Sequence, residues 1–263
     1  MEKLMTPNRI RQTAAEGRIP VGHMLMQFGT SGIAKLCEFA DLDFVLIDME
    51  HGPFGIREVS DIIAGFKATS ISPIVRVPAS EYDFVARVMD AGAHGIMAPN
   101  VRTAEQARKL NAAMRYAPSG DRGLGLGAAH NDFIPPDPVT YMSEVNARNL
   151  LICQIESQAA IDDLEAIAET PGVDCLWVGH FDLTQSMGIV GQFDHPDFLA
   201  AMKRVTSCAR EHGMFAGIQP GSQAQANAWI DLGFDLISYS ADIGIYRSAL
   251  RADVEAVRAI VKA

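Results

Sequence analysis

Short apolar runs alternate with longer segments of helical periodicity along the whole chain. The runs are rich in Val, Ile, Leu and Met, and they are continuously apolar, which is typical of parallel strands covered on both faces. Eight runs are expected to be strands: residues 21–28, 43–50, 72–78, 95–100, 150–157, 175–182, 214–220 and 236–242. Eight strand–helix units without a linker predict one (β/α)8 barrel, or TIM barrel, over residues 1–263. An open doubly wound sheet is the alternative, but nothing signals the reversal of strand order that it needs.

The segments between the expected strands carry helix-boundary signals, clearest at residues 80–92, 103–116 and 195–213. The first has Ser80 as its expected N-cap and ends at Gly92. The second opens with a Thr–Glu pair at nearly capping-box spacing, and the third stops at Gly213.

Two regions depart from the repeat. Residues 1–17 lack the apolar core of a signal peptide and are expected to form a short amphipathic helix. Residues 117–149 are rich in Gly, Pro and Asp and are expected to be a long loop that is functional or contacts another subunit. Within it, RGLGLGAA lacks a complete dinucleotide-binding fingerprint, so it is interpreted as a flexible loop near the site, with Arg122 a candidate anion contact.

The composition excludes several classes of partner. A net charge of −10 argues against general binding to nucleic acid or anionic membranes, because both need a basic face. No apolar run approaches the length of a membrane span. The four cysteines lack CxxC spacing and lie in apolar segments, which predicts reduced core thiols and a cytoplasmic protein.

Polar residues recur at the ends of several expected strands. In a (β/α)8 barrel, the carboxyl ends of the strands meet at one mouth and build the active site. Chance placement explains one or two such residues but explains the whole set poorly. The set comprises Asp48, Glu50, His51, Arg76, Gln154, Glu156, His180, Asp182 and Gln219.

Glu156 and Asp182 are candidate metal ligands, because they end neighbouring strands. Two carboxylates without Cys or clustered His ligands suit a hard divalent cation such as Mg²⁺ or Mn²⁺. The structural alternative is that each carboxylate caps the helix that follows it. As a pair they favour the metal site.

Arg76 and His51 are candidates for the chemistry itself. A buried arginine needs a partner, which is either a structural carboxylate or an anionic substrate. A histidine that acts as a base near neutral pH is best held by a carboxylate. Asp90 is a candidate for that carboxylate, although spacing alone does not establish the contact. The other histidines form no metal-binding spacing and are expected to be structural.

Six segments in order, LIDMEHGP, IVRVP, MDAG, RYAPSGDRGLG, ICQIES and VGHFDLTQSMG, resemble the HpcH/HpaI aldolase family of class II pyruvate aldolases. The resemblance extends from about Gly22 to the last helix. It implies a barrel of the phosphoenolpyruvate/pyruvate type whose last helix is exchanged between subunits, in a homo-oligomer, usually a hexamer built as a trimer of dimers. It also implies metal-dependent, reversible cleavage of a 4-hydroxy-2-oxo acid into pyruvate, or a related 2-oxo acid, and an aldehyde from aromatic or sugar-acid catabolism.

The resemblance also implies roles for residues. Glu156 and Asp182 would bind Mg²⁺ or Mn²⁺, with Co²⁺ a further candidate, and Gln154 would lie beside the bound oxo acid. Backbone amides near Phe181 and Asp182 would hold the substrate carboxylate.

The remaining implied roles concern proton transfer and charge. Arg76 would stabilise the enolate oxygen, and His51, paired with Asp90, would be the acid/base. No lysine stands at a comparable strand end, which argues against a Schiff-base aldolase.

The chain departs from the family pattern at Gly179-His180-Phe181-Asp182, where Gly-Pro-Ala-Asp is usual, and at Gln219, where an aliphatic residue is common. These changes leave open which aldehyde the enzyme accepts. Two alternative functions are an oxo-diacid decarboxylase or lyase that uses the same metal–enolate site, and a non-catalytic barrel that binds a 2-oxo acid.

Overall fold

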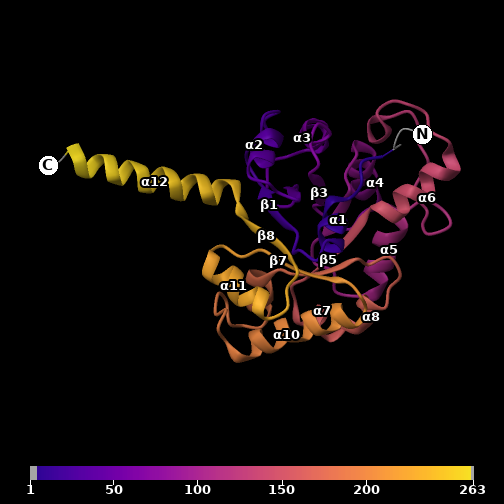
Figure 1. Cartoon of the computed structure of the whole chain (residues 1–263). Coiled ribbons are helices and arrows are strands. Elements are labelled where there is room, and N and C mark those ends of the chain that lie inside the picture. The colour runs from indigo at the N-terminus through magenta and orange to yellow at the C-terminus, as the bar shows by residue number, and fades with distance from the viewer. Residues whose placement is uncertain (1–4, 262–263) are drawn as a thin grey trace.

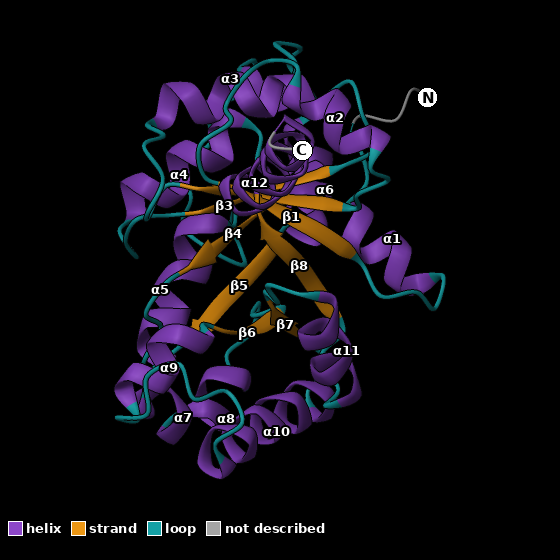
Figure 2. Cartoon of the chain, turned by 90° about the vertical axis from the view of Figure 1, so that its left-hand side faces the viewer, coloured by secondary structure: helices purple, strands orange, loops and turns teal. Residues whose placement is uncertain are grey.

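A closed barrel of eight parallel strands forms the centre of the computed structural model, which describes residues 5–261 (Figure 2). The strands follow one another around the barrel in chain order, and β8 pairs with β1 to close it. The predicted (β/α)8 barrel is confirmed. The strands are β1 Val21–Leu25, β2 Phe44–Asp48, β3 Ser72–Arg76, β4 Gly95–Ala98, β5 Leu150–Ile155, β6 Cys175–Val178, β7 Phe215–Ile218 and β8 Leu236–Ala241.

Helices surround the barrel, and most of them connect one strand to the next (Figure 2). No helix of the described residues is long and apolar enough to cross a membrane. The helices are α1 Arg9–Ala15, α2 Ile33–Phe39, α3 Ile56–Phe66, α4 Tyr82–Ala91, α5 Ala104–Met114, the 3₁₀ turn η1 Ala129–Asn131, α6 Pro138–Arg148, α7 Gln158–Asp162, α8 Leu164–Ala168, α9 His180–Ser186, α10 Pro196–Glu211, α11 Gln223–Asp231 and α12 Asp242–Val261.

The continuous apolar strands are explained by two separate cores. Successive side chains of a strand point to opposite faces, so in β2 Phe44 and Leu46 fill the barrel interior, whereas Val45 and Ile47 pack against the helices. Every residue of β2 is buried for this reason. The four cysteines are likewise buried and free, which confirms the expected core thiols.

Several predicted boundaries change in the structure. The strand expected at 175–182 ends at Val178, and His180 to Asp182 form the first turn of α9 instead. The expected loop at 117–149 contains η1 and the helix α6, whose N-cap is Asp137. The expected N-cap Ser80 is wrong, because α4 begins after Glu81 without a side-chain cap.

Other boundary signals are confirmed. Gly92 and Gly213 lie in the left-handed region directly after α4 and α10, with φ of 108° and 67°. Thr103 is the N-cap of α5 as expected, but its partner in the capping box is Gln106 rather than the predicted glutamate, because Glu105 pairs with Lys109.

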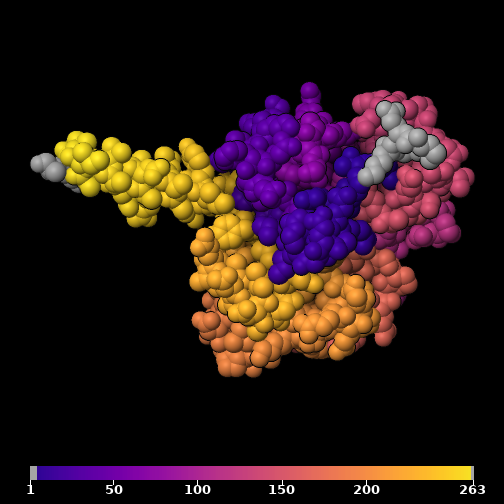
Figure 3. Space-filling model, viewed as in Figure 1, coloured from indigo at the N-terminus to yellow at the C-terminus, as the bar shows by residue number. Residues whose placement is uncertain are grey.

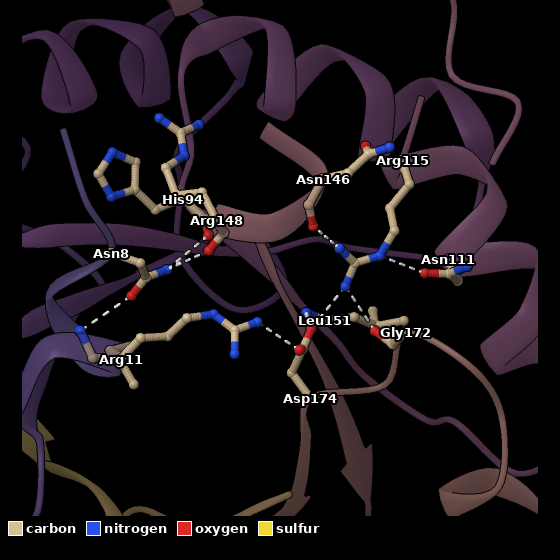
Figure 4. A network of polar contacts seen from close by, with 11 residues as sticks. Asn8, Arg11, His94, Asn111, Arg115, Asn146, Arg148, Leu151, Gly172 and Asp174 are labelled. Carbon is tan, nitrogen blue, oxygen red and sulfur yellow. Dashed lines mark hydrogen bonds and ion pairs between the residues drawn. The ribbon is translucent and has the colours of Figure 1, made fainter. Parts of the chain in front are cut away.

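The amino-terminal end of the barrel is covered by α1. Of the helix predicted at residues 1–17, the structure shows Arg9–Ala15 as helical, and residues 1–4 lie outside the described residues. Ile10 packs into the barrel core, and Asn8 donates to the carbonyl oxygens of His94 and Arg148, which precede β4 and β5 (Figure 4). Arg11 and Arg115 both pair with Asp174, at 2.7 and 2.9 Å.

This end also carries a cavity of about 830 Å³ beside Arg11, Arg115 and Asp174. The guanidinium of Arg115 is held by Asn111, Asn146, Gly172 and Asp174 (Figure 4). These contacts tie together segments that precede the strands, and contacts at this end of a barrel serve stability.

The last helix behaves differently from the others. α12 projects away from the barrel as an arm from the carboxyl end of β8 (Figures 1 and 3). Its exposed apolar residues are Ile243, Ile245, Tyr246, Leu250, Val254, Val257, Ile260 and Val261. Packing of this helix against the barrel of the same chain is limited to its first turns.

Candidate active site

The inward-facing positions of three strands become polar at their carboxyl ends. In β2 the inward series Phe44 and Leu46 continues to Asp48, and in β3 Ile74 is followed by Arg76. In β5 the series Leu150 and Ile152 continues to Gln154 and then to Glu156 just beyond the strand. The alternation of side chains therefore places these four polar groups in the mouth of the barrel.

Arg76 is bound by two carboxylates. Its Nε and Nη2 donate to Oδ1 and Oδ2 of Asp48, both at 2.7 Å, and its Nη1 lies 3.1 Å from Oε2 of Glu50. Burial by itself disfavours the charged guanidinium, but the hydrogen bonds and charge of Asp48 outweigh burial, so the pKa of Arg76 is raised. The partner that a buried arginine requires is thus present within the chain, and the Glu50 side chain that contacts Nη1 is 16% exposed, compared with 0% for Asp48.

Glu156 is buried in the mouth with little compensation for its charge. Its Oε1 accepts from the backbone N–H of Asn100 at 2.6 Å, and its Oε2 accepts from Nε2 of Gln154 at 2.5 Å. Burial raises the pKa of Glu156 to about 7, and the carboxylates of Asp182 and Glu50 add to the effect against these hydrogen bonds. The site therefore holds a buried carboxylate whose charge the hydrogen bonds from Asn100 and Gln154 offset only in part.

The residues around Glu156 fit a bound cation. Gln154 Oε1 is buried and has no hydrogen-bond partner among residues 5–261, so an acceptor oxygen is left open beside Glu156. A Cβ at Gly179 would lie 2.2 Å from Oε2 of Glu156, so the glycine keeps this side of the carboxylate clear. Oxygen ligands of this kind suit Mg²⁺ or Mn²⁺.

Asp182 completes the candidate metal site from the first turn of α9. It is solvent-exposed, and its charge is among the causes that raise the pKa values of Glu50 and Glu156. No group of three His, Cys, Asp or Glu side chains in the described part of the chain is arranged to hold a metal by itself. A cation bound by Glu156 and Asp182 would therefore keep coordination positions for water and substrate.

The structure does not bring His51 and Asp90 together within the described chain. His51 is exposed at the mouth, with Nε2 3.8 Å from Oε2 of Glu50. Asp90 lies in the last turn of α4, which runs back toward the amino-terminal end, and it accepts from Nη2 of Arg122 at 2.5 Å. Arg122 is buried over the ring of Tyr116, so its contact in the structure is Asp90 rather than an anion near the mouth.

His180 and Phe181, which depart from the family pattern, belong to an aromatic cluster beside Asp182. The His180 ring lies 4.7 to 5.1 Å from the rings of Phe181, Phe193 and Trp229. Burial in this cluster lowers the pKa of His180 to about 4, so the imidazole is neutral at pH 7. Phe181 is 59% exposed. Gln219 donates to the carbonyl oxygen of Ser240 and links the segment after β7 to β8.

Two residues of the site, Glu50 and Asn100, were given no role by the sequence. Glu50 contacts Arg76 and approaches His51, and its position two residues after a buried strand was the available signal. Asn100 holds Glu156 through its backbone N–H and lies at φ 54°, a conformation that asparagine tolerates better than most residues. That backbone contact joins segments 56 residues apart, and no local pattern predicts it.

Known proteins are similar in sequence to this chain over nearly its whole length. The chain is 30% identical over 259 residues to the 5-keto-4-deoxy-D-glucarate aldolase of Klebsiella pneumoniae subsp. pneumoniae, which covers 98% of this chain and 100% of that protein. It is 37% identical over 246 residues to the hydroxypyruvate/pyruvate aldolase of Paraburkholderia phytofirmans, covering 91% and 94% of the two chains.

The fold of this chain is also similar to that of a solved structure from the same family. The crystal structure of an HpcH/HpaI aldolase from Desulfitobacterium hafniense DCB-2 superimposes with a TM-score of 0.90 at 28% identity, and covers 95% of this chain and 96% of that one. The family model of HpcH/HpaI aldolase/citrate lyase matches residues 27–249. The chain therefore belongs to the HpcH/HpaI aldolase/citrate lyase family.

Proposed function

We propose that this aldolase uses a divalent metal to cleave a 4-hydroxy-2-oxo acid reversibly into pyruvate, or a related 2-oxo acid, and an aldehyde. The observation that carries the proposal is the buried Glu156, which has an open acceptor oxygen of Gln154 beside it and Arg76 in the same mouth. Relatives named as aldolases for 5-keto-4-deoxy-D-glucarate and for hydroxypyruvate/pyruvate support this class of substrate. The donor is proposed to be pyruvate or hydroxypyruvate.

Glu156 and Asp182 would hold Mg²⁺ or Mn²⁺ (Co²⁺ is a further candidate), and Gln154 would lie beside the oxo acid. A bound cation would supply a Lewis acid, which stabilises the negative charge that develops on the substrate as the C3–C4 bond breaks. The backbone N–H groups of Phe181 and Asp182 at the start of α9 would hold the substrate carboxylate. The exposed ring of Phe181 would then stand near the bound substrate.

Arg76 would act on the 2-oxo-acid half of the substrate, and His51 would act on the half that becomes the aldehyde. Nη1 of Arg76 is the nitrogen not committed to Asp48, so it would donate to the oxygen on which negative charge develops. His51 would take the proton of the C4 hydroxyl as the C3–C4 bond breaks, so that C4 leaves as the aldehyde carbon and the bonding electrons remain on the enolate. The enolate then takes a proton at C3 to become the free 2-oxo acid. In the synthetic direction the imidazolium returns this proton to the new alkoxide.

The pairing of His51 with Asp90 requires a second copy of the chain. His51 follows the carboxyl end of β2, whereas Asp90 lies at the other end of the barrel, where α4 leads into β4. The Asp90 side chain is 46% exposed although Arg122 beneath it is buried, so its free side faces outward. We therefore place Asp90 of one subunit at the mouth of its neighbour.

The apolar surfaces of the chain support assembly. α12 exposes its apolar side chains, and an apolar groove of about 590 Å³ lies where α2, β1 and the start of α12 meet. The groove is lined by Ile33, Leu36 and Leu42, among others, and an amphipathic helix of a second copy would bury this surface. This arrangement supports our proposal that α12 is exchanged between subunits of a homo-oligomer, which we propose is a hexamer.

Mixed oligomers are expected to show which chain supplies Asp90. His51→Ala and Asp90→Asn should each be nearly inactive alone, because each site then lacks one partner. In oligomers assembled at random from equal amounts, about one quarter of the sites regain both residues if the pair spans two chains. The measurement is the aldol-cleavage rate of differently tagged, co-expressed variants after tandem purification.

A pair within one chain would regain no activity in the same mixture. Two tagged copies of His51→Ala, co-expressed and purified in the same way, are the control for carry-over of host enzyme. Full activity of Asp90→Asn alone would remove Asp90 from the proposal.

Metal-dependent enolate formation is the direct test of the proposed function. Pyruvate in D₂O should exchange its methyl protons, as followed by NMR, with Mg²⁺ or Mn²⁺, and EDTA should abolish the exchange. Exchange with hydroxypyruvate alone would identify the donor as that acid. Absence of exchange with both acids and all three metals, in protein that binds the metal, would refute aldolase chemistry at this site.

A further inference from the structure

One oxygen of Glu50 lies between the two groups on which the proposed reaction depends. Oε2 is 3.1 Å from Nη1 of Arg76 and 3.8 Å from Nε2 of His51. The first distance is a close ion pair, and the second is within ion-pair range but longer than a hydrogen bond. Nε2 of His51 therefore faces a carboxylate and still has room to accept a proton.

The backbone around Glu50 is held so that this geometry is fixed in advance. The N–H of Glu50 donates to Oδ1 of Asp48 at 3.0 Å, and the N–H of Met49 donates to the carbonyl oxygen of Arg76 at 3.0 Å. Asp48 thus holds both the guanidinium of Arg76 and the main chain of Glu50. The Glu50 side chain is only 16% exposed, so it has few alternative positions.

His51 has no comparable support. Its side chain is 60% exposed, and Glu50 is the carboxylate recorded within ion-pair distance of its ring in the part of the chain that the structure describes. An exposed imidazole samples several rotamers, and a base is effective only when it is held within reach of the proton that it takes. A carboxylate beside the ring on the same chain would therefore restrict its rotamers in addition to Asp90 of the neighbouring subunit.

We propose that Glu50 is a positioning residue, which holds Nη1 of Arg76 and the imidazole of His51 in a fixed relation and stabilises the imidazolium when His51 takes the C4 hydroxyl proton. This inference rests on the proposed function, because it assigns Glu50 to the same reaction. Asp90 of the neighbouring subunit would contact the other ring nitrogen, so the two carboxylates have different tasks.

The charges around Glu50 agree with this role. It faces Arg76 from β3, Asp48 and His51 from its own segment, and Asp182 from α9. Burial raises the pKa of Glu50, the repulsion by Asp48 and Asp182 adds to it, and Arg76 and His51 oppose it. A positive charge formed on His51 would lie 3.8 Å from Oε2 of Glu50 and would be stabilised by this carboxylate.

The test compares Glu50→Gln and Glu50→Ala with Glu165→Gln. Glu165 is a matched control, because it pairs with Arg204 on the surface between α8 and α10, where loss of the same charge has little effect. In both Glu50 variants, kcat for aldol cleavage should fall by about 10- to 100-fold, while KM for the oxo acid should stay within about threefold. The acidic limb of the pH–rate profile of Glu50→Gln should move to lower pH, because the charged imidazole has lost its neighbouring carboxylate.

A double-mutant cycle separates positioning from general support of the fold. The part of the effect that passes through His51 is absent from His51→Ala, so Glu50→Gln should lower the residual rate of His51→Ala by a smaller factor than it lowers the wild-type rate. Equal factors in the two backgrounds, or an unmoved pH profile in Glu50→Gln, would overturn the proposal. Unchanged kcat in the folded Glu50→Gln variant would do the same.

The proposed function is judged separately in the same experiment. Wild-type protein that exchanges the pyruvate methyl protons in a metal-dependent way supports the aldolase proposal whatever the Glu50 variants do. If wild-type protein shows no exchange and no cleavage, both the proposed function and this inference are refuted. Circular dichroism and thermal unfolding verify that each variant is folded.

Discussion

Glu156→Gln is expected to abolish the metal-dependent reaction and, at the same time, to stabilise the metal-free protein above pH 7. Activity is lost because glutamine cannot supply the negative charge that a divalent cation requires of this ligand. The loss should be at least about 10³-fold, since the Lewis acid supplies several kcal/mol of charge stabilisation in the proposed reaction. Asp182→Ala should likewise lower the activity.

The gain in stability follows from the buried charge. The pKa of Glu156 rises from its ordinary 4.5 to about 7, so between these values the folded protein binds more protons than the unfolded chain. The free energy of unfolding therefore falls as the pH rises through this range, by on the order of 2–3 kcal/mol. Glutamine is neutral at every pH, and a flipped Gln154 amide would accept from it through the oxygen that now has no partner.

The measurement is chemical unfolding of both proteins in EDTA at pH 5 and pH 8. The stability difference between the variant and the wild type should be largest at pH 8 and small at pH 5. Bound metal should reverse the order, because it stabilises only the wild type. Full activity of Glu156→Gln in EDTA would contradict the metal assignment.

Arg76→Ala is expected to lose both activity and stability. Asp48 is fully buried and forms two hydrogen bonds with this guanidinium, so removing Arg76 leaves an uncompensated buried carboxylate. Breaking a buried pair in this way costs about 3–5 kcal/mol. Loss of the donor at the developing oxyanion should lower kcat by about 10²–10³-fold.

Two further variants separate these effects. Arg76→Lys keeps the charge but not the two-pronged contact with Asp48, so its stability and activity should be intermediate. Adding Asp48→Asn to Arg76→Ala removes the buried charge, which should restore part of the stability but none of the activity. Denaturant unfolding and the cleavage rate are measured on all three. Wild-type kcat in a folded Arg76→Ala protein would exclude the proposed role.

The sequence predicted the barrel because its strands are continuously apolar, a local property that reflects burial on both faces. It also predicted the positions of polar residues at the strand ends, since the end of an apolar run is visible without knowing the fold. α6 was missed because only Tyr141 and Val145 of this helix are buried, so its apolar pattern is weak. His180 to Asp182 were assigned to a strand because only Gly179 separates β6 from α9, so no loop marks the end of the strand.

The sequence by itself determined the number of strands, their order along the chain and the residue types that reach the mouth of the barrel. The tertiary structure decided which of these residues meet. Closure of the barrel sets the register that places Arg76 opposite Asp48 on neighbouring strands, and brings the Asn100 amide to Glu156. It also places His51 and Asp90 at opposite ends of the barrel, because a helix that follows a parallel strand runs back the full length of the sheet.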